Sequence, residues 1–342
     1  MLNLAAIHLF EHSLRLKNRV TGVGWHADPL RHFDAGGVDE AERLCLEASG
    51  DLLAFLRPPP DLHPGVPDFR TVVRPGRGRV TSITFESPLP SGRPENDRVV
   101  VRVVPSARPR TDRKAIVFHH ALLQKHWLLW EWFVAPLAQR FPVVILAAPY
   151  HFERTPPGEY PSEGMVNPNP WRLYQALRQW SWDHKALMNG LPAVAGLEPV
   201  AVVGFSLGAF QSILAAASGS LDDLPIVAIA STNRYAHGLF HGALGGGTVH
   251  GIRRAGIDRE RLERMVDAIQ LERYAPAVNG RPVLFIAGRH DRVDPAPSAE
   301  RLERALGPKR SLWLDAGHST VVLMRDRIGR EILTFLEDHG VR

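Results

Sequence analysis

The sequence predicts an α/β fold in which a mainly parallel, twisted sheet is covered by helices on both faces. Short runs of continuous apolar residues recur along the chain, and helical stretches separate them; the runs span residues 115–118, 143–148, 200–203, 226–230, 282–288 and 311–314. Strands that are apolar throughout are typical of parallel sheets buried on both faces. A chain of 342 residues that is 44% hydrophobic can also bury a large core.

The first 57 residues are expected to be largely helical. Apolar side chains recur there at helical spacing and are expected to pack on the core, namely Ala41, Leu44, Cys45, Ala48, Leu52, Phe55 and Leu56. A Pro-rich linker over residues 58–67 ends this helical part. Residues 80–87 and 99–104 then alternate or run apolar, a pattern typical of a leading β-hairpin.

These elements indicate two parts of unequal size. We expect a helical amino-terminal appendage with its linker at residues 1–70, and a main domain at residues 71–342. Two inserts, at about 149–198 and 232–280, leave the sheet at its carboxyl edge, where ligands bind in open α/β sheets. The inserts are therefore expected to shape a substrate pocket.

Composition narrows the classes of function. The single Cys45 excludes an internal disulfide framework, and no apolar run approaches the ~20 residues that span a bilayer. The amino terminus lacks the pattern of a signal peptide, so a cytoplasmic location is expected. Lys and Arg number 41 against 36 Asp and Glu, and the basic residues are scattered, so no nucleic-acid partner is expected.

The most informative motif is the pentapeptide Gly204-Phe205-Ser206-Leu207-Gly208. It directly follows an apolar strand and precedes a segment rich in small residues, which is the context of a nucleophile elbow. The two glycines leave room for a backbone that turns sharply from strand to helix, and the serine hydroxyl projects from the edge of the sheet. The helix amino end behind it offers free N–H groups that suit an oxyanion.

An acid and a base for this serine follow at the ends of later strands. Asp291 comes after the run at 282–288, and His318 comes after the last apolar run. The order Ser, Asp, His is that of α/β-hydrolases, and the chain resembles this superfamily over about residues 80–340. The resemblance implies that Ser206 is the nucleophile, His318 the general base, and Asp291 the carboxylate that orients the imidazole.

The neighbours of this acid leave alternatives open. Asp291 could instead form a turn or cap a helix, in which case Asp294 or Asp315 would supply the carboxylate. His290 is a rival base, but its adjacency to Asp291 directs the two side chains apart, and we reject it.

The oxyanion site needs a second N–H besides that of Leu207. The resemblance assigns it to the loop after the strand at residues 115–118, where relatives carry glycine and this chain has His119-His120-Ala121-Leu122. The donor is therefore either Ala121 or Leu122. His120 is a candidate substrate-binding residue, although the histidine pair could equally be structural, buried and bonded to loop carbonyls.

The two inserts supply the remaining candidates for substrate binding. Tyr150, His151 and Arg154 belong to the first insert, and Tyr235 and His237 to the second; together they are expected to line the entrance to the nucleophile. An anionic group on the substrate would suit Arg154, which could instead brace the cap or form a surface ion pair.

The inserts contain two further patterns. Pro149-Tyr150 followed by a basic loop is similar to the α/β-hydrolase subgroup typified by domain-containing protein eighteen. His237 and His241 have the i, i+4 spacing of a metal pair, but no acidic third ligand lies nearby in the sequence, so neither a metal nor another cofactor is expected.

The sequence thus predicts a serine hydrolase that cleaves a small-molecule carboxylic ester or thioester through an acyl-enzyme, as an esterase or lipase-like enzyme does. One alternative is an acyltransferase that uses the same triad with an acceptor other than water. The other is a non-catalytic α/β-hydrolase scaffold. The oligomeric state is left open.

Overall fold

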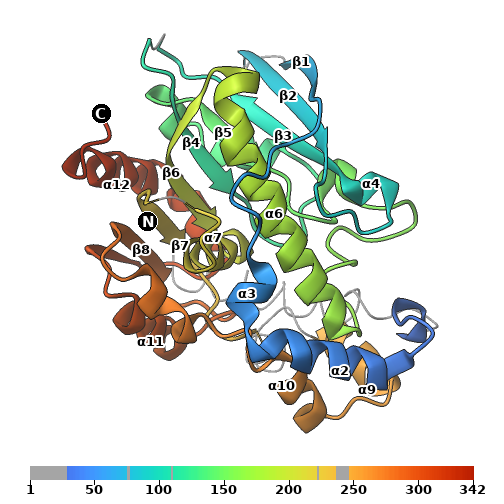
Figure 1. The fold of residues 1–342 in the computed structure, drawn as a ribbon. Coiled ribbons are helices and arrows are strands. Elements are labelled where there is room, and N and C mark those ends of the chain that lie inside the picture. The colour runs from blue at the N-terminus through green and yellow to red at the C-terminus, as the bar shows by residue number, and fades with distance from the viewer. Residues whose placement is uncertain (1–28, 75–77, 109–110, 222, 236–245) are drawn as a thin grey trace.

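The computed structural model describes residues 29–74, 78–108, 111–221, 223–235 and 246–342, and its strands form one nine-stranded sheet (Figure 1). The strand order is β1-β2-β3-β5-β4-β6-β7-β8-β9. Neighbours from β5 to β9 run parallel, whereas β1, β2 and β3 are antiparallel to their neighbours. The strands are β1 (Asp68–Arg74), β2 (Gly78–Glu86), β3 (Arg98–Val104), β4 (Lys114–His119), β5 (Val143–Leu146), β6 (Glu198–Phe205), β7 (Ile226–Ile229), β8 (Val283–Gly288) and β9 (Arg310–Leu314).

Helices cover both faces of this sheet, which confirms the predicted α/β architecture. One face packs against α6 (Pro170–Ala195), α7 (Leu207–Ala217) and α11 (Ala296–Leu306), and the same core extends to α2 (Gly37–Gly50), α3 (Leu52–Leu56) and α10 (Arg259–Val266), which pack on these helices. The other face packs against α5 (Leu128–Phe133) and α12 (Arg325–Asp338). Further elements connect them: η1 (Pro29–His32), α4 (Pro94–Asp97), η2 (Leu137–Gln139), η3 (Phe152–Arg154), α9 (Gly246–Arg254), η4 (Leu271–Arg273), η5 (Ala275–Val278) and η6 (Thr320–Met324).

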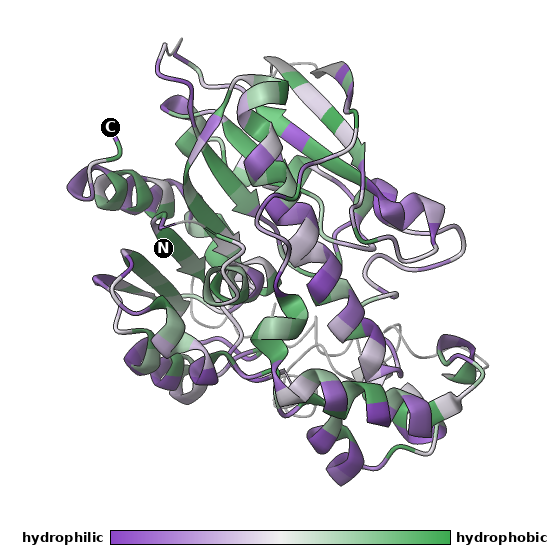
Figure 2. Cartoon of the chain, in the orientation of Figure 1, coloured by the Kyte–Doolittle hydropathy of each residue, from purple (hydrophilic) through white to green (hydrophobic). Residues whose placement is uncertain are grey.

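The central strands are apolar throughout because both of their faces are buried. In β8, Phe285 and Ala287 belong to the core on the α6 side, whereas Leu284 and Ile286 belong to the core on the α12 side. Successive side chains of a strand point to opposite faces, so each central strand contributes side chains to both cores. Figure 2 shows the hydrophobic strands between helices that are hydrophilic on their outer sides.

The antiparallel edge of the sheet contains one strand that the sequence did not predict. The expected hairpin is present as β2 and β3, but β1 pairs with β2 along its whole length, from Asp68 opposite Thr84 to Arg74 opposite Gly78. At the amino-terminal side, α2 buries Ala41 and Cys45 against α6 and α10. Within the described residues, no helix combines the length and the apolar character needed to cross a bilayer.

Strained backbone gathers at the carboxyl edge of β4 to β7. Five non-glycine residues with positive φ follow these four strands: Leu123 (63°), Tyr150 (63°), Phe152 (52°), Ser206 (54°) and Ala230 (48°). Such conformations cost about 1–3 kcal/mol each and persist where the surroundings enforce them, often at active sites. The strained residues therefore indicate that a functional site lies at this edge of the sheet.

The packing of α12 can be tested at Gly329. A Cβ there would lie 2.5 Å from Pro136 Cβ, so Gly329→Ala should destabilise the fold by about 1–3 kcal/mol in urea denaturation. Helix propensity alone predicts that this substitution stabilises the fold, because alanine favours the helix more than glycine does. Gly50→Ala is the control, because a Cβ at Gly50 meets nothing within 4 Å and should leave stability unchanged or slightly raised. An equal gain for both variants would show that α12 does not pack as described.

Candidate active site

Ser206 lies at the sharp turn between β6 and α7, with φ 54° and ψ −116°. The turn is tight enough that a Cβ at Gly204 would overlap the backbone of Ala209. A Cβ at Gly208 would overlap the carbonyl oxygens of His119 and His120 at the end of β4. Both glycines are therefore required by close approach of backbone, as the pentapeptide predicts. Ser206 N–H donates to Ile229 O (2.8 Å), which ties the turn to β7.

The structure brings the serine, the histidine and one aspartate into direct contact. Ser206 Oγ lies 2.8 Å from His318 Nε2, and His318 Nδ1 lies 2.7 Å from Asp291 Oδ2. A carboxylate can only accept, so Nδ1 carries the proton and Nε2 accepts from the serine hydroxyl. All three residues are buried, which strengthens electrostatic interactions among them. The arrangement can remove a proton from Ser206.

Asp291 is held in place by its own loop. Asp291 Oδ1 accepts the N–H groups of Val293 (2.7 Å) and Asp294 (2.9 Å), which leaves Oδ2 for His318. The alternative acids lie differently. Asp294 is buried behind this turn, where burial and the nearby Asp291 raise the pKa of its carboxyl to about 7.

The rival base and the remaining alternative acid pair with each other. His290 Nε2 lies 2.6 Å from Asp315 Oδ1, and the side chain of Asp315 is 72% exposed. Neither side chain is part of the contact between Ser206, His318 and Asp291.

The predicted oxyanion donors lie around the same turn. Leu207 is the first residue of α7, so its N–H has no acceptor within the helix. The loop that carries Ala121 and Leu122 follows β4, and the close approach at Gly208 places the start of this loop against the first turn of α7. The two candidate amides directly follow the residues that approach α7.

His119 joins the nucleophile helix to α6. The Ser212 hydroxyl donates its proton to Gly208 O (2.8 Å). Ser212 Oγ therefore accepts from His119 Nδ1–H (2.9 Å). His119 Nε2 then accepts from His184 Nδ1–H (3.0 Å). Burial holds the pKa of His119 well below 6.5 and lowers that of His184 to about 3, so both rings are neutral at pH 7. These bonds fix α7 against the end of β4.

His120 is fully buried and is bonded to backbone on both sides of its ring. Nε2 accepts from Ala148 N–H (2.9 Å), and Nδ1–H donates to Ala121 O (2.7 Å). Burial, with a smaller effect of His151, holds its pKa well below 6.5. The sequence left two roles open for His120, in substrate binding or in the structure of the loop. The contacts match the structural role, since neither ring nitrogen is available to a substrate.

The first insert buries its polar side chains instead of presenting them at an entrance. Arg154 is 0% exposed, and its guanidinium donates to Asn96 O (2.8 Å), Ala147 O (2.9 Å) and Asp183 Oδ2 (2.8 Å). This placement corrects the expectation of a substrate-facing Arg154, because every nitrogen of the group is bonded inside the protein. Its physical role is to hold the turn that follows β5.

The neighbours of Arg154 are buried as well. His151 is 0% exposed; its Nδ1–H donates to Pro149 O (2.8 Å), and burial lowers its pKa to about 4. The ring of Tyr150 packs against Gly164 so closely that no Cβ would fit there. No sequence signal identified this network, because α6 carries several charged side chains and its buried face could not be known from the sequence.

The second insert is described in part. Tyr235 is half-buried and packs on the α6-side core, whereas His237 and His241 lie outside the described residues. Across the described ranges, no three His, Cys, Asp or Glu side chains are grouped so as to hold a metal ion.

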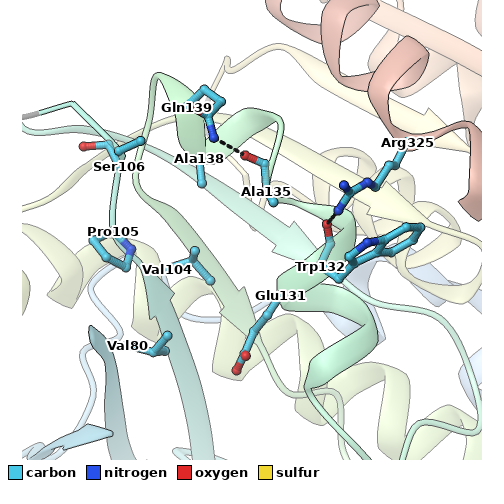
Figure 3. Close-up of a pocket in the computed structure, with 11 residues that line it drawn as sticks. Val80, Val104, Pro105, Ser106, Glu131, Trp132, Ala135, Ala138, Gln139 and Arg325 are labelled. Carbon is cyan, nitrogen blue, oxygen red and sulfur yellow. Dashed lines mark hydrogen bonds between the residues drawn. The ribbon is translucent and has the colours of Figure 1, made fainter. Parts of the chain in front are cut away.

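A surface pocket of about 540 Å³ lies away from these residues (Figure 3). Val104 and Trp132 line it, and Arg325 NH1 donates to Trp132 O (2.5 Å) at its rim. Val104 pairs with Val143, the first residue of β5, so the pocket lies at the amino edge of the parallel strands. Ser206 lies at the opposite edge.

The role of Arg154 can be tested by stability. Removing one partner of a buried ion pair leaves an uncompensated charge, so Arg154→Met should cost about 3–5 kcal/mol in urea denaturation. The double variant Arg154→Met with Asp183→Leu should recover part of this loss. Arg264→Ala is the control, since its pair with Glu42 is exposed and should change stability by less than about 1 kcal/mol. A loss below 1 kcal/mol for Arg154→Met would contradict the buried pair.

Neither a family model nor the sequence of a characterised protein matches this chain. Several solved structures are similar to it. The acetyl xylan esterase from Paenibacillus sp. R4 has a TM-score of 0.58 and 13% identity, covering 93% of this chain and 98% of its own. Acetyl xylan esterase 1 from Thermoanaerobacterium sp. has a TM-score of 0.56 and 15% identity, covering 94% and 98%.

The acylaminoacyl peptidase from Pyrococcus horikoshii has a TM-score of 0.52 and 12% identity, covering 80% of this chain and 42% of its own. At such identities the likeness is one of fold. Together with the strand order and the turn at Ser206, it shows that the chain has the fold of the α/β-hydrolase superfamily.

Proposed function

We propose that the protein is a serine hydrolase that cleaves a small-molecule carboxylic ester or thioester through an acyl-enzyme. The observation that carries the proposal is the continuous chain of contacts from Ser206 Oγ through His318 to Asp291, with separations of 2.8 and 2.7 Å. A serine at a strained strand-to-helix turn, next to a base that an acid orients, is the general arrangement of an activated nucleophile.

The contacts support a proposed role for each side chain. Ser206 Oγ attacks the carbonyl carbon while its proton passes to His318 Nε2. Asp291 keeps the Nδ1 proton in place and stabilises the imidazolium that forms. His318 then gives the proton to the leaving alcohol or thiol, and an acyl ester remains on Ser206. Water attacks this ester with His318 as base, which releases the acid and restores the serine.

Charge that develops on the carbonyl oxygen needs donors that are in place beforehand. The Leu207 N–H at the start of α7 is one, and an amide of the loop after β4 is the other. Both belong to backbone that is fixed by the approach of β4 to α7 at Gly208. The proposed reaction requires no metal or organic cofactor.

The similar structures support the general class of reaction. Two of those named above are acetyl xylan esterases and the third is an acylaminoacyl peptidase. An esterase and a peptidase both cleave an acyl bond, and cleavage of an acyl bond is the chemistry proposed here. The substrate of this chain is assigned by class alone.

The nucleophile is tested by covalent labelling. A fluorophosphonate should label the protein, and Ser206→Ala should abolish labelling and lower turnover of short p-nitrophenyl esters by about 10⁴-fold or more. Ser231→Ala is the matched control, because Ser231 is also buried just beyond a strand but is bonded to Thr232 O instead of a histidine. Labelling that survives in Ser206→Ala, or no labelling of the wild type, would refute the proposal.

The acid is tested by comparing two neighbouring carboxyls. Asp291→Asn should lower kcat by about 10³–10⁴-fold, because an amide at this position favours the wrong imidazole tautomer. Asp294→Asn should keep kcat within about tenfold, since the carboxylate bonded to His318 Nδ1 is that of Asp291 and not that of Asp294. Steady-state rates of both variants with p-nitrophenyl acetate give the comparison, and a larger loss for Asp294→Asn would reassign the acid.

A further inference from the structure

The loop after β4 contains a buried histidine, His120. The ring of His120 is 0% exposed and is surrounded by aromatic rings. Its centroid lies 5.0 Å from that of His151, 4.6 Å from Phe152, and 6.2 Å from Trp180. A side chain packed this tightly has one orientation, so the groups bonded to it are fixed in direction too.

The hydrogen bonds of His120 show which way the ring points. Its Nε2 accepts from the N–H of Ala148, which lies just beyond β5. In the sheet, β4 lies between β5 and β6. The ring therefore lies on the β5 side of the loop, away from β6 and the turn at Ser206.

The same ring fixes the peptide between Ala121 and Leu122. His120 Nδ1–H donates to Ala121 O (2.7 Å), so this carbonyl points toward the β5 side. A trans peptide is planar, and its N–H points opposite to its C=O. The Leu122 N–H consequently points toward the β6 side, where Ser206 and the amino end of α7 lie. Among the described residues, no acceptor is bonded to this N–H.

The preceding peptide has the reverse orientation. A Cβ at Gly208 would lie 2.7 Å from His120 O, so this carbonyl faces α7. By the same planarity, the Ala121 N–H points away from α7. The orientations of the two adjacent peptides therefore both indicate that the Leu122 N–H, and not the Ala121 N–H, faces the nucleophile.

We propose that His120 is a positioning residue that holds the Ala121–Leu122 peptide so that the Leu122 N–H, with the Leu207 N–H, binds the oxyanion. The inference rests on the proposed function and resolves the choice between Ala121 and Leu122. His120 touches no reacting atom and exchanges no proton during the reaction. Its ring acts through its two hydrogen bonds to the backbone.

The inference is tested with three variants at one position. An asparagine places its side-chain amide where Nδ1 of histidine stands, so His120→Asn keeps a donor for Ala121 O. A glutamine reaches the position of Nε2 and loses that donor, so His120→Gln is the matched comparison. His120→Phe keeps the ring and removes both bonds.

Two readouts report the oxyanion site directly. The first is the second-order rate constant for labelling of Ser206 by a fluorophosphonate, and the second is the inhibition constant of butylboronic acid, whose tetrahedral adduct places an oxygen in that site. Turnover of p-nitrophenyl acetate separates kcat from KM. Loss of one oxyanion donor costs about 10²–10³-fold in kcat, which sets the scale of the effect.

We expect His120→Phe and His120→Gln to lower the labelling rate constant and kcat by about 10²-fold and to weaken boronate binding in proportion, with KM nearly unchanged. His120→Asn should stay within about fivefold of the wild type in every readout. The pH at half-maximal labelling should be the same in all variants, because the contact between His318 and Ser206 is unaffected.

The outcomes separate the two proposals. Absence of labelling in the wild type would refute the proposed function itself. Labelling of the wild type with equal rates for His120→Asn and His120→Gln, or a raised KM with unchanged kcat, would refute the role of His120. If His120→Phe does not fold, the comparison of asparagine with glutamine still decides, because both variants keep a buried amide at this position.

Discussion

The contact between the end of β4 and the first turn of α7 sets the geometry of the whole carboxyl edge. It exists because residue 208 has no side chain, so the carbonyls of His119 and His120 rest directly on the helix. The neighbouring Ser206 has left-handed backbone, a conformation that costs about 1–3 kcal/mol for a non-glycine residue. Sheet hydrogen bonds on one side and helix bonds on the other, such as Phe210 N–H to Ser206 O (3.0 Å), hold it there.

Behind this edge, the interior is unusually polar for a parallel sheet. Arg154 and Asp183 form a buried pair, and burial raises the pKa of Asp183, an effect that the guanidinium partly offsets. Asn96 extends the network, because its Oδ1 accepts from Tyr150 N–H (2.8 Å) and its Nδ2 donates to Gln179 (2.7 Å). Such networks are costly to desolvate and tolerate little displacement once satisfied. The strained turn after β5 is therefore held by fixed polar contacts.

Much of the architecture could be predicted from sequence because the central strands are buried on both faces. Their apolar runs are continuous, and the motif around Ser206 lies between a strand and a helix in the structure as in the prediction. The chain order also suggested which histidine and which aspartate would serve the serine, and His318 does lie in contact with Ser206, while Asp291 lies in contact with His318. Their catalytic roles remain a prediction.

The errors share a physical origin in contacts that are distant along the chain. The edge strand β1 carries charged side chains, as edge strands commonly do, so its sequence has no continuous apolar run. Arg154 was expected to line the entrance to the nucleophile because its partner, Asp183, lies 29 residues away on a helix whose buried face could not be known. The orientation of the His120 ring likewise depends on Ala148, 28 residues further along the chain.

The packing of α2 has a consequence for how the chain is made. Its buried face rests on α6 and α10, and Arg261 of α10 donates to Glu42 across 219 residues of sequence. A ribosome adds about 5–20 residues per second, so α2 emerges about 10–45 s before this partner exists. Until then its apolar stripe has no complete surface to cover it. Biosynthesis of this protein therefore includes an interval in which α2 has been made but its α10 partner has not.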